Sequence, residues 1–347
     1  MKICIISEPW KLPTEYYGGT QRIVSLLCEG LIERGFEISL MAGKGTTYKT
    51  KKTLYYKNQS TNLIDRGFRR LDFSIKSFKL AKDCDVIHTF KNWPSYHTII
   101  NKLNKPVIYS HQGVCKKDDF IVLKKCNPKN GYLWGVSNNQ LSKLDKKEKD
   151  RIFMIPMALN TDIIKPVENP ARDYLAYIGR LNYDKGIDLA VKLSIITGNK
   201  LMIAGEVREL EDEAKLLFKE KVEPFLGENI KFIGPINDEK KSDFLGNAKA
   251  LLMLNRWDEP FGLTMAEALA TGTPIIGTKK GSIPEIVKNG ENGFLCDSFE
   301  DMVEALKKLN TISSINCRQT ALNKYSKDVF IDSMLEMYEK VISFSKK

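Results

Sequence analysis

Two glutamates, Glu259 and Glu267, frame the segment of this 347-residue chain whose residue types most readily do chemistry. Glu259 stands directly before Pro260, a residue that suits the first position of a helix. Backbone amides in the first turn of a helix have no partner inside the helix, so the segment predicts an anion-binding helix end. The amides concerned belong to Phe261, Gly262 and Leu263.

The spacing of the two carboxylates suits a nucleotide. Glu267 follows Pro260 by about 10 Å along a helix axis that rises 1.5 Å per residue, roughly the reach from a phosphate to a ribose or base. One carboxylate before the anion site and one beyond it could bracket a nucleotide diphosphate sugar by accepting hydrogen bonds from hydroxyls at both ends. An amphipathic helix with two solvated glutamates has the same spacing, so spacing alone leaves both interpretations open.

A basic loop is the second candidate for binding an anion. Arg180 and Lys185 follow a predicted strand, and Gly186 opens the next predicted helix. Phosphate-binding loops occupy this position in doubly wound folds, and two cations there could meet a pyrophosphate. A solvated surface loop is the alternative interpretation, because lysine and arginine are mostly exposed.

Two successive patterns of alternating strands and helices must position these residues. In the first half we expect a helix over Thr20–Arg34 and strands over Lys2–Ser7, Phe36–Met41, Val86–Phe90, Pro106–Ser110, Tyr132–Val136 and Ile152–Ile155. In the second half we expect strands over Tyr174–Ile178, Lys200–Ala204, Ile230–Ile233, Ala250–Leu254 and Pro274–Gly277. The helices expected there cover 186–196, 208–220, 238–247, 261–271 and 326–345.

The predicted fold class is α/β, with two Rossmann-like, doubly wound domains. Such domains in tandem would place a central cleft between the carboxyl ends of their parallel sheets, where these folds bind ligands. We expect the first domain to span 1–157 and the second 173–325, joined by a proline-containing linker over 158–172. The final helix, 326–347, could return to brace the first domain.

The composition is that of a globular protein, with 42% hydrophobic and 28% charged residues. No run approaches the roughly 20 apolar residues of a membrane helix, and the N-terminus turns polar too early for a signal peptide, so we expect a cytoplasmic protein. The seven cysteines include no Cys-x-x-Cys pair. We therefore expect reduced thiols rather than disulfides or a zinc knuckle.

The net charge of +11 is unevenly distributed along the chain. Residues 1–157 carry 28 basic and 14 acidic side chains, whereas residues 158–347 carry 26 and 29. This asymmetry points to an anionic partner of the first half, such as nucleic acid, a membrane surface or a phosphorylated substrate. A lysine-rich solvated surface is the alternative.

Four motifs in order over about 120 residues make the chain resemble the retaining GT-B glycosyltransferases of family four, the glycosyl transferases of group 1. The second half supplies Gly-Arg-Leu-x3-Lys-Gly from Gly179, Glu-x7-Glu from Glu259, Ala-Thr-Gly-Thr-Pro from Ala270 and a glycine-rich segment from Gly281. In the first half, Tyr17-Gly18-Gly19 and the strands ending near His88 and His111 match the family as well, so the resemblance covers nearly the whole chain.

The resemblance assigns a role to each matched residue. It implies that Arg180 and Lys185 neutralise the diphosphate, that Glu259 holds hydroxyls of the donor sugar, and that Glu267 holds the ribose. His111 matches the family's active-site histidine near the donor sugar. Gly18 and Gly19 would let the backbone approach the phosphate or the acceptor, although an ordinary turn would also explain them. The chain departs from the family pattern after Pro156 and after Gly205, where expected glycines are absent.

The activity implied by the resemblance is the retaining transfer of a hexose-type sugar from a nucleotide diphosphate sugar, with UDP as the expected nucleotide, to a hydroxyl acceptor. The family would use this reaction in polysaccharide, lipopolysaccharide or glycolipid biosynthesis. We expect no cofactor, no metal and no nucleic-acid partner, and we expect an anionic, lipid-linked or glycan acceptor, with peripheral association at the inner membrane face.

Asp83 and Asp85 form an Asp-x-Asp, a pattern that can bind a metal ion, but they introduce a predicted strand. A sugar-nucleotide epimerase of the same fold and a non-catalytic sugar- or nucleic-acid-binding protein are the alternatives.

Overall fold

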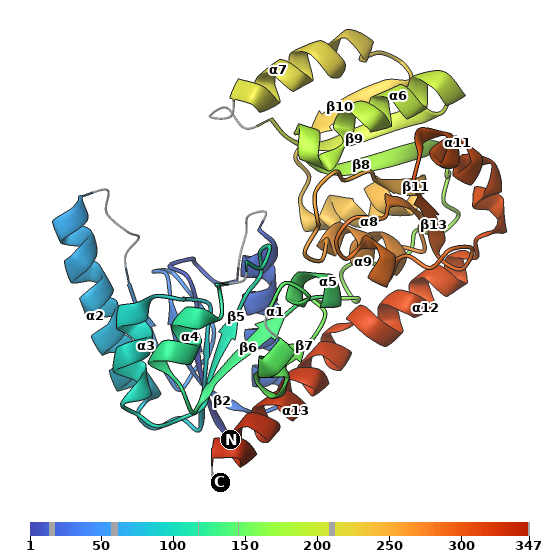
Figure 1. Ribbon diagram of the computed structural model, residues 1–347. Helices are drawn as coiled ribbons and strands as arrows, with labels where there is room; N and C mark the ends of the chain where they lie inside the picture. The colour runs from blue at the N-terminus through green and yellow to red at the C-terminus, as the bar shows by residue number, and fades with distance from the viewer. Residues whose placement is uncertain (14–17, 57–61, 117, 145, 208–211, 346–347) are drawn as a thin grey trace. The chain divides into compact units, whose positions relative to one another are not determined.

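The computed structural model describes residues 1–13, 18–56, 62–116, 118–144, 146–207 and 212–345. The chain forms two compact units (Figure 1). Unit 1 comprises Met1–Pro156 together with Lys327–Lys347, and unit 2 comprises Met157–Ser326. The basic excess belongs to unit 1, which contains 32 basic and 18 acidic residues, against 22 and 25 in unit 2.

Unit 1 is built on a parallel sheet of seven strands in the order β3-β2-β1-β4-β5-β6-β7. The strands are β1 (Lys2–Ile6), β2 (Glu37–Ala42), β3 (Lys52–Tyr55), β4 (Val86–Thr89), β5 (Val107–Ser110), β6 (Gly131–Gly135) and β7 (Ile152–Met154). The helices are α1 (Gly19–Glu33), α2 (Leu63–Ala81), α3 (Pro94–Asn101), α4 (Ile121–Cys126), α5 (Asn138–Leu141), the 3-10 turn Lys146–Arg151 and α13 (Lys327–Ser345). Strand β3 is an addition to the strands that the sequence predicts.

The C-terminal helix α13 is part of unit 1 and reaches its core. Tyr338 of α13 is fully buried, and its hydroxyl lies 2.5 Å from Nδ1 of His88 on β4. The other ring nitrogen of His88 lies 2.5 Å from the hydroxyl of Ser110 on β5. Burial lowers the pKa of His88 to about 3, because removing the imidazolium from water disfavours the charged form. His88 is therefore a neutral core residue that joins α13 to the sheet.

Unit 2 contains a second parallel sheet, of six strands in the order β10-β9-β8-β11-β12-β13. The strands are β8 (Tyr174–Arg180), β9 (Lys200–Glu206), β10 (Ile230–Gly234), β11 (Ala248–Met253), β12 (Ile275–Thr278) and β13 (Gly293–Cys296). The longer helices are α6 (Ile187–Thr197), α7 (Asp212–Lys221), α8 (Asp238–Gly246), α9 (Leu263–Ala270), α11 (Phe299–Lys308) and α12 (Ser314–Tyr325). The short α10 (Ile283–Ile286) and three 3-10 turns, Tyr183–Lys185, Glu223–Phe225 and Leu309–Thr311, complete the unit. Both units are thus α/β and doubly wound, the GT-B architecture that the sequence predicts.

The segment expected to be a linker, 158–172, packs within unit 2. The guanidinium of Arg318 on α12 donates to the carbonyls of Thr161 and Ile164 at 3.1 and 2.9 Å. Leu159 forms a bridge with Ser326 at the end of the same unit. The chain therefore enters unit 2 directly after Pro156 rather than after a separate connector.

Candidate functional site

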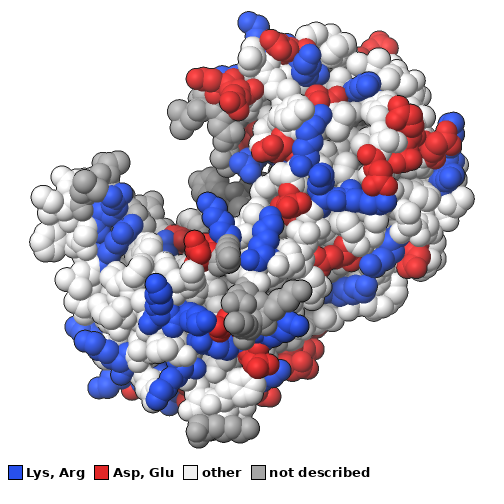
Figure 2. Space-filling model, viewed as in Figure 1, with Lys and Arg blue, Asp and Glu red and all other residues white. Residues whose placement is uncertain are grey.

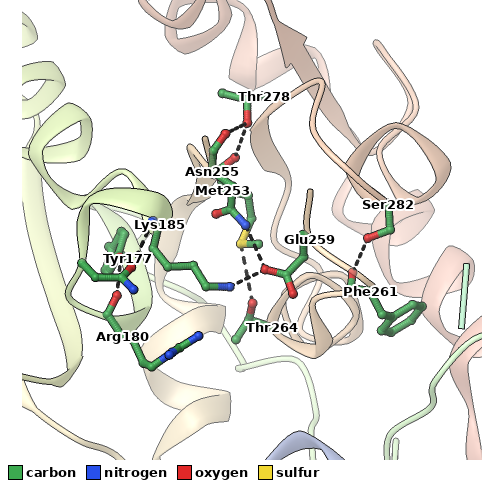
Figure 3. Close-up of polar contacts among 11 residues, drawn as sticks. Tyr177, Arg180, Lys185, Met253, Asn255, Glu259, Phe261, Thr264, Thr278 and Ser282 are labelled. Carbon is green, nitrogen blue, oxygen red and sulfur yellow. Dashed lines mark hydrogen bonds and ion pairs between the residues drawn. The ribbon is translucent and has the colours of Figure 1, made fainter. Parts of the chain in front are cut away.

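The candidate site of unit 2 lies at the point where the order of its strands reverses. From β8 the chain continues to β9 and β10 on one side, whereas β11 pairs with β8 on the other side. Loops at the carboxyl ends of two such neighbouring strands diverge and leave room for a ligand. Lys185 follows β8 and Glu259 follows β11, so the topology brings these two sequence-predicted residues together (Figure 3).

Lys185 and Glu259 form an ion pair between Nζ and Oε2. The amide nitrogen of Asn255 donates to the same Oε2 at 2.9 Å, and the Lys185 ammonium also lies 4.8 Å from the ring centre of Trp257. Glu259 is buried, with 8% of its surface exposed. A cation held this firmly is preorganised to meet the charge of an anionic ligand.

Local backbone constraints fix Lys185. The amide of Lys185 donates to the side chain of Asn182 at 3.1 Å, which caps the short turn that carries it. Gly186 follows in the left-handed region at φ +70°, and a Cβ there would lie 2.1 Å from the carbonyl oxygen of Leu254. Only glycine satisfies both requirements, so Gly186 allows the loop after β8 to lie against the end of β11.

A bidentate ion pair ties the same two loops together. Arg256, which follows β11, donates through both terminal nitrogens to the carboxylate of Asp188 on α6, at 2.7 and 2.6 Å. Its guanidinium also stacks 3.8 Å from the ring centre of Tyr183. Fork-to-fork pairing of this kind fixes geometry as well as charge. Arg256 is not among the residues that the sequence predicts for the site, because an isolated arginine forms no recognisable pattern.

The segment from Glu259 to Phe261 is held by the loop after β12. The amide of Ser282 donates to the carbonyl of Glu259 at 2.8 Å, and the Ser282 hydroxyl donates to the carbonyl of Phe261 at the same distance. A Cβ on Gly281 would lie 2.2 Å from the amide nitrogen of Glu259, and Gly281 adopts φ +58°. The glycine-rich motif that begins at Gly281 thus supports the Glu259 backbone by close approach.

The start of helix α9 differs from the prediction. We expected Pro260 in the first turn, but the helix begins at Leu263, and Gly262 before it adopts φ +79°. The left-handed turn at Gly262 and the hydrogen bonds to the Ser282 loop keep Glu259, Pro260 and Phe261 outside the helix. The expected axial distance from Pro260 to Glu267 is therefore wrong, because Pro260 to Gly262 precede the helix. The free amides of the first turn begin at Leu263 rather than at Phe261.

Glu267, on α9, lies in a buried ion pair that the sequence analysis missed. Its Oε1 lies 2.6 Å from Nζ of Lys241 on α8, and Lys241 is completely buried. Lys241 also lies 3.2 Å from a carboxylate oxygen of Asp238. Lys241, Phe244 and Leu245 share the buried face of α8 at helical spacing, so a lysine at an apolar position was the available signal.

Arg180 ends strand β8, where its carbonyl accepts a hydrogen bond from the Tyr177 hydroxyl at 2.8 Å. Its side chain is half-buried and makes no ion pair within the described part of the chain. Figure 3 shows Arg180 on the loop side of β8, together with Lys185 and Glu259. Arg180, Lys185 and Glu259 thus cluster at the carboxyl edge of one sheet.

In unit 1, His111 follows strand β5 and is held by several neighbours. The Tyr109 hydroxyl lies 3.1 Å from Nδ1 of the imidazole, and the carbonyl oxygen of Val114 lies 3.2 Å from Nε2. Asp119 approaches Nε2 to 3.5 Å. The ligand atoms of His111, Cys115 and Asp119 all lie within 4.8 Å of one another, a combination with which transition metals are bound in other sites. The fold creates this group, which the sequence analysis did not predict.

Asp83 and Asp85, the Asp-x-Asp of the sequence, are the other candidate metal ligands, and Asp85 has a structural role. The carboxylate of Asp85 accepts a hydrogen bond at 2.7 Å from the backbone amide of Lys2. Asp85 therefore joins the entrances of the neighbouring strands β1 and β4, at the amino edge of the sheet. Ligands in doubly wound folds bind at the opposite, carboxyl edge.

The glycines Gly18 and Gly19 open helix α1. Gly18 is the N-cap in extended conformation at φ −177°, and Gly19 is the first helical residue. The atom nearest to a Cβ on Gly18 would be Oε1 of the flexible Gln21 side chain, at 2.8 Å. Tyr17 of the same motif lies outside the described residues.

Unit 1 repeats the constellation of unit 2 at its own reversal point, between β1 and β4. Glu8 follows β1, Lys91 follows β4, and the two form an ion pair. The ammonium of Lys91 lies 4.7 Å from the ring centre of Trp93, as that of Lys185 lies against Trp257. Each unit therefore presents a Lys–Glu pair beside a tryptophan where a ligand is expected in its fold.

Comparisons with known proteins agree with this architecture. Residues 160–329 match the family model described as glycosyl transferases group 1. An uncharacterized 41.2 kDa protein in the cps region of Klebsiella pneumoniae is 29% identical over 310 residues, which cover 76% of this chain and 81% of that protein. The structure of HepE from Anabaena in complex with UDP superposes with a TM-score of 0.75 at 14% identity, over 98% of this chain and all of that one. The lipopolysaccharide outer core galactosyltransferase WaaB in its apo form superposes with a TM-score of 0.70 at 16% identity, over the full length of both chains.

Proposed function

We propose that this chain is a glycosyltransferase of group 1, because residues 160–329 match that family's model and both units have the fold of GT-B enzymes. In this proposal unit 2 binds a nucleotide diphosphate sugar, with UDP as the nucleotide, and a hexose passes from it to a hydroxyl acceptor with retention of configuration. The observation that carries this proposal is the Lys185–Glu259 pair at the reversal point between β8 and β11, with Arg180 beside it. Neither a cofactor nor a metal is needed in this scheme.

The cations act on the leaving group. Breaking the bond between the sugar and the phosphate leaves negative charge on the diphosphate, and Arg180 and Lys185 stabilise that charge. Amides of the first turn of α9 add partial positive charge from the helix end. The carboxylate of Glu259 and the ring of Trp257 hold the Lys185 ammonium in one place, so little reorganisation is needed during the reaction.

The glutamates act on hydroxyl groups. A carboxylate accepts hydrogen bonds only, so Glu259 suits the hydroxyls of the donor sugar next to the diphosphate. Glu267 is placed on the following helix and suits the hydroxyls of the ribose. The ion pair with Lys241 holds this buried carboxylate in place.

Retention follows from attack on the face that the leaving group departs from. The bond from the anomeric carbon to the diphosphate oxygen breaks, and the bond to the acceptor oxygen forms on the same side. The proton of the acceptor hydroxyl passes to an oxygen of the departing phosphate. This step requires no protein nucleophile, and the pair of Lys185 and Arg180 lowers its barrier by stabilising the phosphate charge.

The acceptor is proposed to be anionic, lipid-linked or a glycan, and to meet unit 1. This unit carries a formal charge of +14, whereas unit 2 carries −3. Figure 2 shows basic side chains over the visible face of unit 1. No helix within the described ranges is both long and apolar enough to cross a membrane. A role in surface polysaccharide synthesis at the cytoplasmic side of a membrane is part of this proposal, and the likeness to a protein encoded in a cps region is in keeping with the polysaccharide role.

A donor screen tests the proposal. Melting temperatures are measured with UDP-, GDP-, ADP- and dTDP-sugars, and a ligand at about 100 times its dissociation constant adds about 2.7 kcal/mol of stability. We expect stabilisation by UDP-sugars, followed by release of UDP when an acceptor is present. Stabilisation by no nucleotide sugar would refute donor binding, and a changed sugar without acceptor would identify an epimerase instead.

A further inference from the structure

Helix α2 of unit 1 carries a row of apolar side chains on its solvent side. The exposed fractions are 72% for Ile64, 70% for Phe68, 49% for Leu71 and 43% for Ile75. Their spacing of four, three and four residues places all four within a sector of about 60° on the helix surface. Along the axis the row extends for about 16 Å.

The opposite face of α2 is the one that packs against the sheet. Phe73, Ser77 and Leu80 point inward and are buried. Helix α2 therefore has one apolar face that packs against the core and a second apolar face that is exposed to solvent. A surface helix usually has only the first, with polar residues on its solvent side. We call the open row of Ile64, Phe68, Leu71 and Ile75 the α2 stripe. Solvent exposure of four large apolar side chains in one row marks an interaction surface.

The charges of helix α2 are predominantly basic. The helix contains five basic and two acidic residues, and each acidic residue is neutralised by a basic neighbour four residues on. These pairs are Asp65–Arg69 at 2.8 Å and Asp72–Lys76 at 2.7 Å. Lys79 is exposed near the C-terminal end of the stripe, and Lys82 follows directly after the helix. Figure 2 shows uncharged atoms over α2 with basic side chains beside them.

We propose that α2 lies in the headgroup region of an anionic lipid bilayer, with the α2 stripe inserted and the exposed Lys79 and Lys82 at the lipid phosphates. Interfacial helices combine an apolar row with flanking cations in this way, and long basic side chains reach up to the headgroups while their stems stay apolar. Each basic residue near an anionic surface adds attraction that salt screens. A lipid surface accepts a straight, narrow row flanked by positive charge, which is what α2 presents.

This inference deepens the proposed function, because a lipid-linked acceptor would be met where α2 touches the membrane. Its test does not depend on the transfer reaction. The full-length chain is sedimented with vesicles of phosphatidylcholine alone and of phosphatidylcholine mixed with phosphatidylglycerol, at low and high salt. The variant Ile64→Ser/Phe68→Ser removes half of the α2 stripe. Its control, Ile196→Ser/Ile315→Ser, removes residues that are 56% and 77% exposed on helices of unit 2.

We expect the parent and the control to bind the anionic vesicles, and the Ile64→Ser/Phe68→Ser variant to bind them on the order of ten- to a hundredfold more weakly. All three should melt at similar temperatures and respond equally to UDP-sugars, since the substitutions are exposed and lie outside the donor site. Equal binding by parent and variant would overturn the proposal, because the basic residues alone would then account for it. Concentration-dependent dimers that the same variant abolishes, without vesicle binding, would overturn it in favour of a second copy of the chain.

If UDP-sugars failed to bind while the vesicle result held, the proposed function would fall and the role of α2 would stand.

Discussion

At the scale of single residues, the candidate site depends on the environments of two glutamates rather than on their spacing. Glu259 lies in a loop and faces a lysine, an asparagine amide and the end of strand β11. Glu267 lies on helix α9 and faces a lysine that is buried completely. The two carboxylates are thus held by different neighbours, and their removal should affect different steps.

We predict that Glu267→Ala weakens nucleotide binding and that Glu259→Ala mainly slows transfer. The reason is that Glu267 suits the ribose, which does not react, whereas Glu259 suits the sugar at the reacting carbon. Calorimetric titration with UDP measures the first effect, and turnover at saturating UDP-sugar measures the second. Parental binding and parental turnover in both variants would show that the two carboxylates do not bracket the donor.

At the scale of secondary-structure elements, the Lys241–Glu267 pair joins helices α8 and α9. Breaking a buried ion pair by removing one partner leaves an uncompensated charge. We predict that Lys241→Met costs about 3–5 kcal/mol of unfolding free energy. In the matched double variant Lys241→Met/Glu267→Met no buried charge stays behind, because Asp238 is exposed to solvent, so we expect most of that stability to return. Denaturant unfolding of the parent, the single variant and the double variant measures these free energies. If the double variant were as unstable as Lys241→Met, the unpaired charge would not be the cause of the loss.

Buried histidines in unit 1 predict a pH dependence of stability. Burial lowers the pKa of His88 and of His97 to about 3 each, below the ordinary value of 6.5. The unfolded chain therefore binds more protons than the folded chain below pH 6.5, and stability falls as the pH falls toward 3. The expected loss approaches about 1.4 kcal/mol per pH unit for each histidine. The melting temperatures of the parent and of His97→Gln are measured between pH 7 and pH 4. We expect the melting temperature to fall less steeply with falling pH in the variant. If both proteins showed the same fall, groups other than His97 would cause the loss of stability.

Most strands of the two sheets are predictable from the sequence, because buried parallel strands are continuous apolar runs such as Ile3–Ile6 and Leu251–Leu254. Strand β3 does not follow this pattern, because it is a half-exposed edge strand whose four residues, Lys52–Tyr55, do not form an apolar run. Strand β13 begins in a glycine- and asparagine-rich segment that favours a turn.

The elements of the site were partly predictable. The residues Arg180, Lys185 and Glu259 were placed correctly at strand ends, which is a consequence of topology. The start of α9 could not be predicted in the same way. It depends on the left-handed conformation of Gly262 and on hydrogen bonds from the Ser282 loop, which is distant in the sequence. Lys241 was missed because a buried lysine requires a partner that only the folded chain supplies.

At the scale of the whole molecule, each unit places a Lys–Glu pair at the reversal point of its sheet. In unit 2 this pair is proposed to serve the donor, and the basic excess of unit 1 is proposed to serve the acceptor. The scheme uses protein cations where other sugar transfers use a divalent ion. Charge stabilisation at the diphosphate should therefore be independent of added metal.

We predict that activity persists in excess EDTA. Arg180 and Lys185 supply the positive charge, so chelation removes nothing that the reaction needs. Loss of activity that magnesium or manganese restores would implicate Asp83 as a ligand together with Asp85. Restoration by zinc alone would instead implicate the group of His111, Cys115 and Asp119, whose ligand atoms already lie close together. Metal titrations with Cys115→Ser as the comparison would distinguish these two results.

The turnover of UDP-sugar by Lys185→Ala and by Arg180→Ala tests most directly whether these two cations stabilise the diphosphate. The control is Lys192→Ala, because Lys192 lies on α6 and its one contact among the described interactions is with the ring of Phe299. We predict that each of the first two variants folds like the parent and loses about 10²–10³-fold in turnover, the loss expected for one preorganised charge stabiliser, while Lys192→Ala keeps parental turnover. Parental turnover in both Lys185→Ala and Arg180→Ala would contradict the account, because the diphosphate would then be stabilised elsewhere.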